Sequence, residues 1–241
     1  MNPYEWHYCG PESQASIWAF GHETLTDLLK RELEAELMDI GARRVKTFNR
    51  GAEAAQTFLE PREAAVFVSV GYPVIIAVAG TLMIAAHATI DSLINRPAVG
   101  GEWRENGPMN IVHVIIKEFT ARGIAASDIS MRLYLAPIRA LRYPFTRVHK
   151  DGGYTEAGER NRKLHEFVTM HWPKSIDYGQ DPEGLNLNIG RLMELQANEC
   201  GVRNIYREIP LEGYALAPEL VFANGDAPAV PNNLIIIMRD A

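Results

Sequence analysis

The sequence predicts an α/β (α+β) sandwich in which mixed β-sheets are flanked by helices. Two patterns indicate this class. Short apolar runs rich in β-branched residues, typical of buried strands, recur at 65–70, 74–79 and 82–86. Longer segments with apolar residues at helical spacing occupy 24–40 and 110–122. Because strand and helix patterns are mixed along the chain, the two kinds of element are expected to pack as layers around a shared core.

Turn signals separate the three apolar runs. Gly71-Tyr72-Pro73 breaks the first run from the second, and Gly80-Thr81 breaks the second from the third, which predicts a tight hairpin. Gly123 provides a natural stop for the helix of 110–122. The segment 95–109, rich in Gly, Pro and charge, is expected to be an exposed loop, either a pocket lid or an insertion.

The rest of the chain continues the mixture of strands and helices, without a repeat or a low-complexity linker. We therefore expect a single domain, residues 1–241. Asn188 can cap one of the later helices. The last run, NLIIIM, is almost continuously aliphatic and is expected to be a buried central strand. The remaining elements are helices at about 155–170 and at 188–199, and strands at 130–135, 204–209 and 233–238.

Composition and charge exclude several kinds of partner. The formal net charge is −6, whereas a duplex-binding surface needs clustered Lys and Arg, so we expect no nucleic acid. The apolar runs stop well short of the roughly 20 residues of a membrane helix, so we expect no membrane partner. No secretory signal is evident at the N-terminus. Cys9 and Cys200 form no ligand pair. These features indicate a cytoplasmic protein, and we expect a monomer or a homodimer.

Several motifs in fixed order resemble one known family. The segment 70–73 (VGYP) stands where that family has Asp-Cys-x-Pro, and 86–92 (AHATIDS) stands where it has Ala-His-Ala-Gly-Trp-Arg-Gly. The stretches 110–137, 185–202 and 225–238 then follow in the expected sequence. Together they resemble the laccase-domain family, the multicopper polyphenol oxidoreductase-type, purine nucleoside phosphorylase-like proteins. The resemblance implies a laccase-domain, cytotoxic-necrotizing-factor-like sandwich, and some members act as zinc-dependent purine nucleoside phosphorylases and adenosine deaminases.

The resemblance also implies which positions would hold zinc, and this chain departs from them. The family's ligands are a His of an upstream His-Gly pair, the Cys of Asp-Cys-x-Pro and the His of Ala-His-Ala. Here these positions fall on Arg50, Gly71 and His87. A catalytic zinc normally has three protein ligands, and losing two removes on the order of four to six decades of affinity. Arg50 would add a positive charge beside the cation. We therefore expect no metal and no cofactor.

Four residues around the emptied site are candidates for function, and each has a plainer alternative. His87 is the candidate catalytic residue, as an acid or base, or else a core histidine. Arg50 is a candidate for binding phosphate or carboxylate, or else a solvated loop residue. Tyr72 could stack on a ligand or pack beside its neighbouring proline. Asp91 could orient His87 or act as a first-turn helix charge.

Three hypotheses follow for function. The first is a metal-independent enzyme acting on a purine nucleoside or another small polar substrate through His87, similar to a phosphorylase or deaminase. The second is a non-catalytic, divergent member that binds a small, nucleoside-like ligand in the old pocket. The third is a metal enzyme that takes its missing ligands from elsewhere, for example His149. Because fold does not specify function and two of the three zinc-ligand positions hold residues that cannot bind zinc, we favour the second hypothesis.

Overall fold

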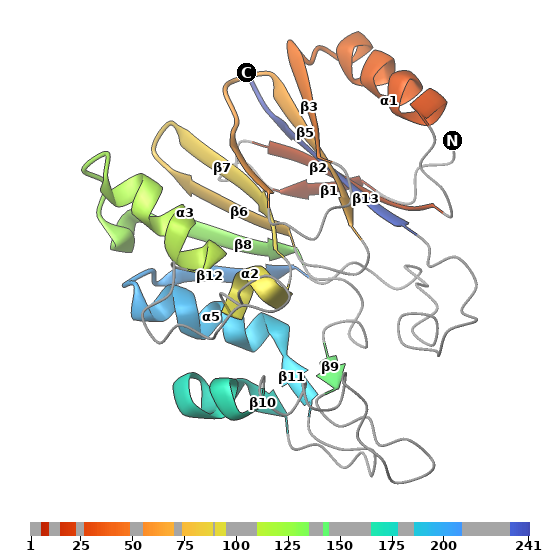
Figure 1. Ribbon diagram of the computed structural model, residues 1–241. Coiled ribbons are helices and arrows are strands. Elements are labelled where there is room, and N and C mark those ends of the chain that lie inside the picture. The colour runs from red at the N-terminus through yellow and green to blue at the C-terminus, as the bar shows by residue number, and fades with distance from the viewer. Residues whose placement is uncertain are drawn as a thin grey trace, which may run out of the picture.

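The structure, a computed structural model, is described for residues 6–9, 15–22, 27–48, 55–69, 74–88, 90–94, 110–134, 142–144, 165–177, 186–208 and 232–241. Within these ranges the strands form two five-stranded sheets and one three-stranded sheet. Helices lie on the outer sides of the two larger sheets (Figure 1). The predicted α/β sandwich is therefore confirmed.

The first large sheet, here sheet A, combines both ends of the described chain with two internal strands. Its order across the sheet is β1 (Trp6–Cys9), β2 (Ala15–His22), β13 (Asn232–Arg239), β5 (Glu63–Ser69) and β3 (Arg44–Phe48). The last strand in sequence, β13, pairs antiparallel with both β2 and β5. The run NLIIIM is thus a central strand, as its aliphatic composition predicts.

The second large sheet, sheet B, contains the predicted hairpin. Its order is β12 (Asn204–Glu208), β8 (Ser130–Tyr134), β6 (Val74–Ala79), β7 (Leu82–His87) and β4 (Ala55–Phe58). Strands β6 and β7 pair antiparallel up to Ala79 and Leu82. Gly80, between them, has φ +56°, a left-handed conformation that glycine adopts without a Cβ penalty.

The small sheet, sheet C, and the helices complete the described structure. Sheet C has the order β10 (Ile176–Asp177), β11 (Asn186–Asn188) and β9 (Arg142–Pro144). The helices are α1 (Asp27–Asp39), α2 (Ile90–Ile94), α3 (Ile111–Thr120) and α5 (Ile189–Glu199), with residues 165–171 also helical and short 3-10 turns at Ala126–Asp128 and Pro173–Ser175. In the part of the chain described, no helix is long and apolar enough to cross a membrane.

Alternation along β5 shows how the layers are built. Ala64 and Val66 are buried against Leu33 and Leu37 of α1, on the outer face of sheet A. Ala65 and Phe67 instead join the core between the two large sheets. Successive side chains of a strand point to opposite faces, so one strand contributes to two cores. The order of layers is therefore α1, sheet A, sheet B and then the helices α2, α3 and α5 (Figure 1).

Sheet B is covered on both faces, which explains its strong sequence signal. Val74 and Ile76 of β6 face sheet A, whereas Ile75 and Ala77 face the helices. The same alternation occurs in β7, where Met83 and Ala85 lie in the inter-sheet core and Ile84 and Ala86 pack under the helices. A strand buried on both faces reads as a continuous apolar run rather than an alternating one.

Most of the predicted elements are present with shifted ends. The helix predicted at 110–122 is α3, capped by Asn110, whose side chain accepts a hydrogen bond from the His113 N–H. Asn188 caps α5 in the same way, through the Arg191 N–H. Of the helix predicted at about 155–170, the structure describes only 165–170, which is helical and continues to residue 171. The 95–109 loop, Arg50, Gly71, Tyr72 and His149 lie outside the described residues.

Candidate functional site

His87 is the last residue of β7, and the register of sheet B defines its surroundings. It pairs across the sheet with Ala55, the first residue of β4, and with Val74, the first residue of β6. Val74 in turn pairs with Tyr134, the last residue of β8. His87 therefore lies at the end of the sheet where β4 and β6 begin and where β7 and β8 end.

The imidazole of His87 is directed between the two large sheets. His87 has the same parity along β7 as Met83 and Ala85, which belong to the inter-sheet core. Its ring stacks on Phe67 of β5, with the ring centroids 6.4 Å apart and the planes inclined by 29°. The residue is only 6% exposed. The side chain thus occupies the end of the core between sheets A and B.

Burial determines the charge of this imidazole. Desolvation lowers the pKa of His87 from 6.5 to about 4. At neutral pH the ring is therefore uncharged and carries one N–H donor and one nitrogen acceptor. Such a group suits hydrogen bonding to uncharged polar atoms. It is poorly suited to general acid–base chemistry at neutral pH, which works best when the pKa lies near the operating pH.

The strand ends also define where the other candidate residues enter the fold. The segment 49–54, which carries Arg50, connects Phe48 of β3 to Ala55 of β4. The segment 70–73, which carries Gly71 and Tyr72, connects β5 to β6. Ala55 and Val74, where those segments rejoin the sheet, are both register partners of His87. Asp91 lies in the first turn of α2, consistent with the helix position predicted for it; its side chain lies outside the description.

The described residues around His87 do not provide a zinc site of the kind that the resemblance implies. Its partners across the sheet are an alanine and a valine, and the ring stacked on it is that of Phe67. None of these side chains can ligate a metal, since zinc takes Cys, His or carboxylate ligands. Among the residues that the structure describes, no group of three or more His, Cys, Asp or Glu side chains could hold a metal ion.

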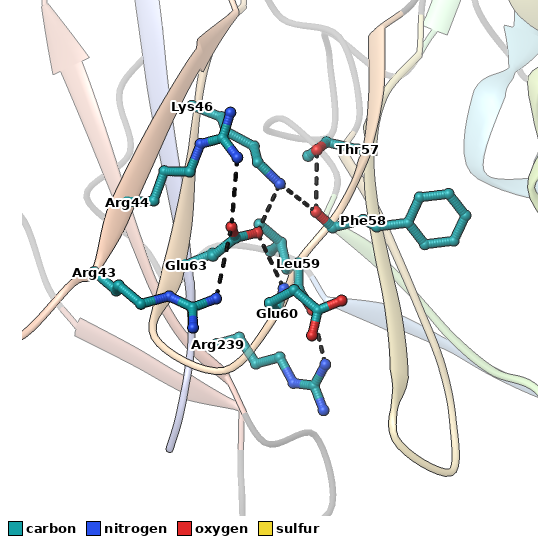
Figure 2. A network of polar contacts seen from close by, with 9 residues as sticks. All are labelled: Arg43, Arg44, Lys46, Thr57, Phe58, Leu59, Glu60, Glu63 and Arg239. Carbon is teal, nitrogen blue, oxygen red and sulfur yellow. Dashed lines mark hydrogen bonds and ion pairs between the residues drawn. The ribbon is translucent and has the colours of Figure 1, made fainter.

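The opposite end of the sandwich carries a polar network that the sequence analysis did not anticipate (Figure 2). Glu63, at the start of β5, is 4% exposed. Its carboxylate accepts hydrogen bonds from Lys46 Nζ at 2.6 Å and from the Glu60 N–H at 3.2 Å. Arg43 and Arg44 each place a guanidinium nitrogen 4.0 Å from the other carboxylate oxygen.

This network, which we call the Glu63 clamp, joins the two large sheets. Lys46 of β3, in sheet A, also donates to the carbonyl oxygen of Phe58 in sheet B at 2.6 Å. Arg239 of β13 donates to the carbonyl oxygen of Leu59 at 2.7 Å. The chain passes from sheet B to sheet A between these residues, so the clamp fixes the crossover. The available sequence signal was Glu63 at the start of the apolar run of β5.

The partners of Glu63 decide its charge. Burial raises the pKa of the Glu63 carboxyl, but the hydrogen bonds from Lys46 and Glu60 and the charges of Lys46 and Arg44 outweigh burial. The net result is a pKa below the ordinary value of a glutamate. The clamp therefore holds a buried, ionised carboxylate.

A second polar pair, also not anticipated, lies on sheet B. The guanidinium of Arg132 in β8 lies over the ring of Tyr206 in β12, 5.0 Å from its centroid. The two residues are direct register partners in the parallel pair of strands. The alternation of polar and apolar residues in SMRLY was the available signal, since it indicates a strand with one polar face.

Comparison with solved structures identifies the fold. NMB0706 of Neisseria meningitidis, described as a DUF152 protein, is similar over 100% of both chains with a TM-score of 0.60 and 11% identity. YlmD of Geobacillus stearothermophilus gives a TM-score of 0.60 and 17% identity over 98% of this chain and 96% of that one. The hypothetical protein YfiH of Bacillus licheniformis gives 0.56 and 10% over 95% and 94%.

Sequence comparison, in contrast to structure comparison, finds no similar protein or family. No protein-family model matches the chain. No curated protein matches it either. The three solved proteins belong to the laccase-like family that the sequence motifs resemble. The chain therefore has the fold of the laccase-like DUF152 proteins.

Proposed function

We propose that this chain is a divergent, non-catalytic member of the laccase-like group that binds a small polar, nucleoside-like ligand at the His87 end of the sandwich. In this proposal it has lost the family's zinc site and requires no cofactor. We further propose a single domain of residues 1–241 that acts in the cytoplasm as a monomer or homodimer, without nucleic acid or membrane as partner.

The observation that carries the proposal is the uncharged imidazole of His87 at a strand end. His87 ends β7, at the end of sheet B where β8 also ends and where β4 and β6 begin. Its pKa of about 4 keeps it neutral, and a neutral imidazole can hydrogen bond to a base or a ribose. The segments with Arg50 and Tyr72 join the sheet at its two register partners, which supports a role for both in binding.

The same observation disfavours the metal-independent enzyme. A general acid at neutral pH must carry a proton, yet a group with a pKa of about 4 is protonated in roughly one molecule in a thousand at pH 7. As a base it would be correspondingly weak. Binding needs neither role, because a neutral imidazole hydrogen bonds without transferring a proton.

The test is calorimetric titration of the chelator-treated protein with adenosine and with inosine, alongside an assay for their turnover. We expect saturable binding of at least one nucleoside, a raised thermal midpoint and no turnover. His87→Ala should weaken binding about tenfold, because a buried hydrogen-bonding group is lost. His171→Ala, at an exposed histidine, is the matched control and should bind as wild type does.

Two outcomes contradict the proposal. Turnover that persists in chelator and vanishes in His87→Ala would establish the enzyme alternative. If neither nucleoside binds to protein that circular dichroism shows to be folded, a nucleoside-like ligand is excluded.

A further inference from the structure

More cations surround the carboxylate of the Glu63 clamp than it can neutralise. Lys46 Nζ lies 2.6 Å from one of the carboxylate oxygens. One nitrogen of Arg43 and one of Arg44 each lie 4.0 Å from the other oxygen, Oε1 (Figure 2). A single negative charge thus lies among three positive charges, which leaves a local excess of positive charge.

The two arginines use little of their hydrogen-bonding capacity. A guanidinium has five N–H donors in a planar fork that matches the oxygens of a phosphate. The 4.0 Å separations from Glu63 are ion pairs, too long for hydrogen bonds, and within the described part of the chain neither guanidinium makes a hydrogen bond. The side chains of Arg43 and Arg44 are 65% and 67% exposed. Their donors are therefore accessible to an anion from solution.

Glu63 keeps the two guanidinium groups close together. Because each nitrogen lies 4.0 Å from the same oxygen, the two nitrogens are at most 8.0 Å apart. Glu63 is itself fixed, since it is buried and its Oε2 accepts hydrogen bonds from Lys46 and from the Glu60 N–H. Charge-assisted hydrogen bonds to phosphate oxygens are about 2.8 Å long. One phosphate group between the two nitrogens can therefore reach both.

A third arginine, Arg62, lies beside Arg43. Its carbonyl oxygen accepts a hydrogen bond from the Arg43 N–H at 2.6 Å, and its side chain is exposed. Arg62 is the third residue of a turn that the Glu63 N–H closes on the Glu60 carbonyl oxygen at 2.9 Å. Its φ of +61° lies in the left-handed region, where turns usually have glycine or asparagine. The chain thus carries a cation here at the cost of backbone strain.

The other carboxylates of this corner do not cancel the excess charge. Glu60 is exposed, so solvent and salt screen its charge. Asp240 follows Arg239, whose carbonyl oxygen accepts from the Arg62 N–H, and Asp240 has an interaction of its own. The chain as a whole has a net charge of −6, so a basic corner runs against its overall charge.

From this arrangement we propose that Arg43 and Arg44, with Arg62 beside them, form a surface site that binds a phosphate group. The inference goes beyond the proposed function, because the site lies at the opposite end of the sandwich from His87 and does not depend on a ligand there. The phosphate can be the free ion or part of a phosphate ester, since the guanidinium fork recognises the same oxygens in both.

The experiment is calorimetric titration of the full chain at low salt with inorganic phosphate, glycerol 3-phosphate and acetate. Wild type should bind about one phosphate group per chain, more tightly than acetate, and added salt should weaken the binding. Tighter binding of the ester than of phosphate would assign the site to esters, and equal or weaker binding would assign it to the free ion.

The variants test which arginines bind the anion. Arg43→Met combined with Arg44→Met should weaken phosphate at least tenfold, because both charged contacts are lost. Arg31→Met combined with Arg203→Met is the matched control. It removes the same charge from two exposed positions elsewhere and should bind as wild type does.

Two further variants separate recognition by the fork from net charge and from damage to the fold. Arg43→Lys combined with Arg44→Lys keeps both charges but loses the planar forks, and it should weaken phosphate several-fold. Arg62→Gly removes the third cation and the backbone strain together. It should weaken phosphate several-fold while the thermal midpoint stays the same or rises.

Three results would overturn the inference. The control pair could weaken phosphate as much as the Arg43 and Arg44 pair does, or the lysine pair could bind as wild type does; in either case the attraction is only diffuse charge. Acetate could bind as tightly as phosphate with the same dependence on the arginines, and the site would then be for carboxylates. None of these results bears on the nucleoside-like ligand, which is tested with other probes.

Discussion

Glu63 and His87 are ionisable residues buried on the inter-sheet side of neighbouring layers, at opposite ends of the sandwich. Glu63 starts β5 and is surrounded by Lys46, Arg43 and Arg44 (Figure 2). His87 ends β7 and lies against the ring of Phe67. The pKa of Glu63 lies below its ordinary value, which keeps the carboxylate charged. The pKa of His87 falls to about 4, which keeps the imidazole neutral.

The difference shows that burial has opposite outcomes for the charge of these two groups. Desolvation opposes the charged form at both ends. At the Glu63 clamp, nearby cations and hydrogen bonds outweigh desolvation, and the result is a rigid crossover between the sheets. At the His87 end desolvation dominates, and the result is a neutral hydrogen-bonding group. We infer that the first end serves stability, and the second is the end at which we propose that the nucleoside-like ligand binds.

The largest expected effect comes from breaking the clamp. Lys46→Met removes the closest cation of Glu63 and the donor to the Phe58 carbonyl. Losing one partner of a buried ion pair leaves an uncompensated charge, so we expect the free energy of unfolding to fall by about 3 kcal/mol. Urea denaturation at pH 7 measures this change. Lys117→Met, at an exposed lysine of α3, is the control and should cost less than about 0.5 kcal/mol.

The clamp variant also has an internal check. Adding Glu63→Gln to Lys46→Met removes the stranded charge, so the double variant should be more stable than Lys46→Met alone. One contrary result would be a fall in the free energy of unfolding of less than about 1 kcal/mol for Lys46→Met. Another would be a double variant whose loss of stability equals the sum of the two single losses. Either result would mean that the ion pair contributes little and that the two ends do not differ as described.

The second effect is the pH dependence that His87 contributes. In the unfolded chain its pKa returns to about 6.5, so between pH 6.5 and 4 the unfolded state binds more protons than the folded state. Stability therefore rises with pH across this window and is lost as pH falls, by about 3 kcal/mol at pH 4 relative to pH 7. His87→Leu should lack this contribution, as judged by urea denaturation of both proteins at several pH values.

Two comparisons sharpen the interpretation of that pH profile. His171→Ala, at an exposed histidine, should keep the wild-type profile. Equal acid sensitivity in wild type and His87→Leu would refute the assignment of a neutral, desolvated imidazole. Loss of stability from Glu63 falls in a different window, below about pH 4.5, because the ordinary pKa of a glutamate is 4.5 and the folded pKa of Glu63 lies below that value.

The smallest effect concerns the hairpin between β6 and β7, which lies at the clamp end of β7. Gly80 has φ +56°, and a Cβ there would meet no atom within 4 Å. Gly80→Ala therefore introduces backbone strain without a clash and should cost about 1 kcal/mol. Because Gly80 and His87 lie at opposite ends of β7, nucleoside binding measured by calorimetry should be unchanged. A several-fold loss of affinity would indicate that the two ends are coupled.

The fold was predictable where strands are buried on both faces or helices are strongly periodic. Strands β6, β7 and β13 read as apolar runs because neighbouring layers cover them. Helices α3 and α5 were visible through their periodicity and through Asn188 as a cap. The N-terminal strands β1 and β2 were not anticipated: β1 pairs with β2, and β2 pairs with β13, more than 200 residues away in the chain. Such pairings leave no local signal.

The candidate site was predictable only in part. His87 was found because it ends a strand with a clear apolar signal. It became the candidate catalytic residue because it stands where the family that the motifs resemble has a zinc-ligating histidine. The Glu63 clamp and the Arg132–Tyr206 pair were missed, since each joins residues from strands that become neighbours only in the folded sheets. The roles of Arg50, Tyr72 and Asp91 remain predictions.

The central claim is that the scaffold persists without its metal site, and elemental analysis tests it most directly. The full chain would be purified without chelator from zinc-supplemented cells and its metal content measured by inductively coupled plasma mass spectrometry. We predict far less than one zinc ion per chain, and no change in the thermal midpoint on adding chelator. About one tightly held zinc or copper per chain, lost in His87→Ala, would contradict the account.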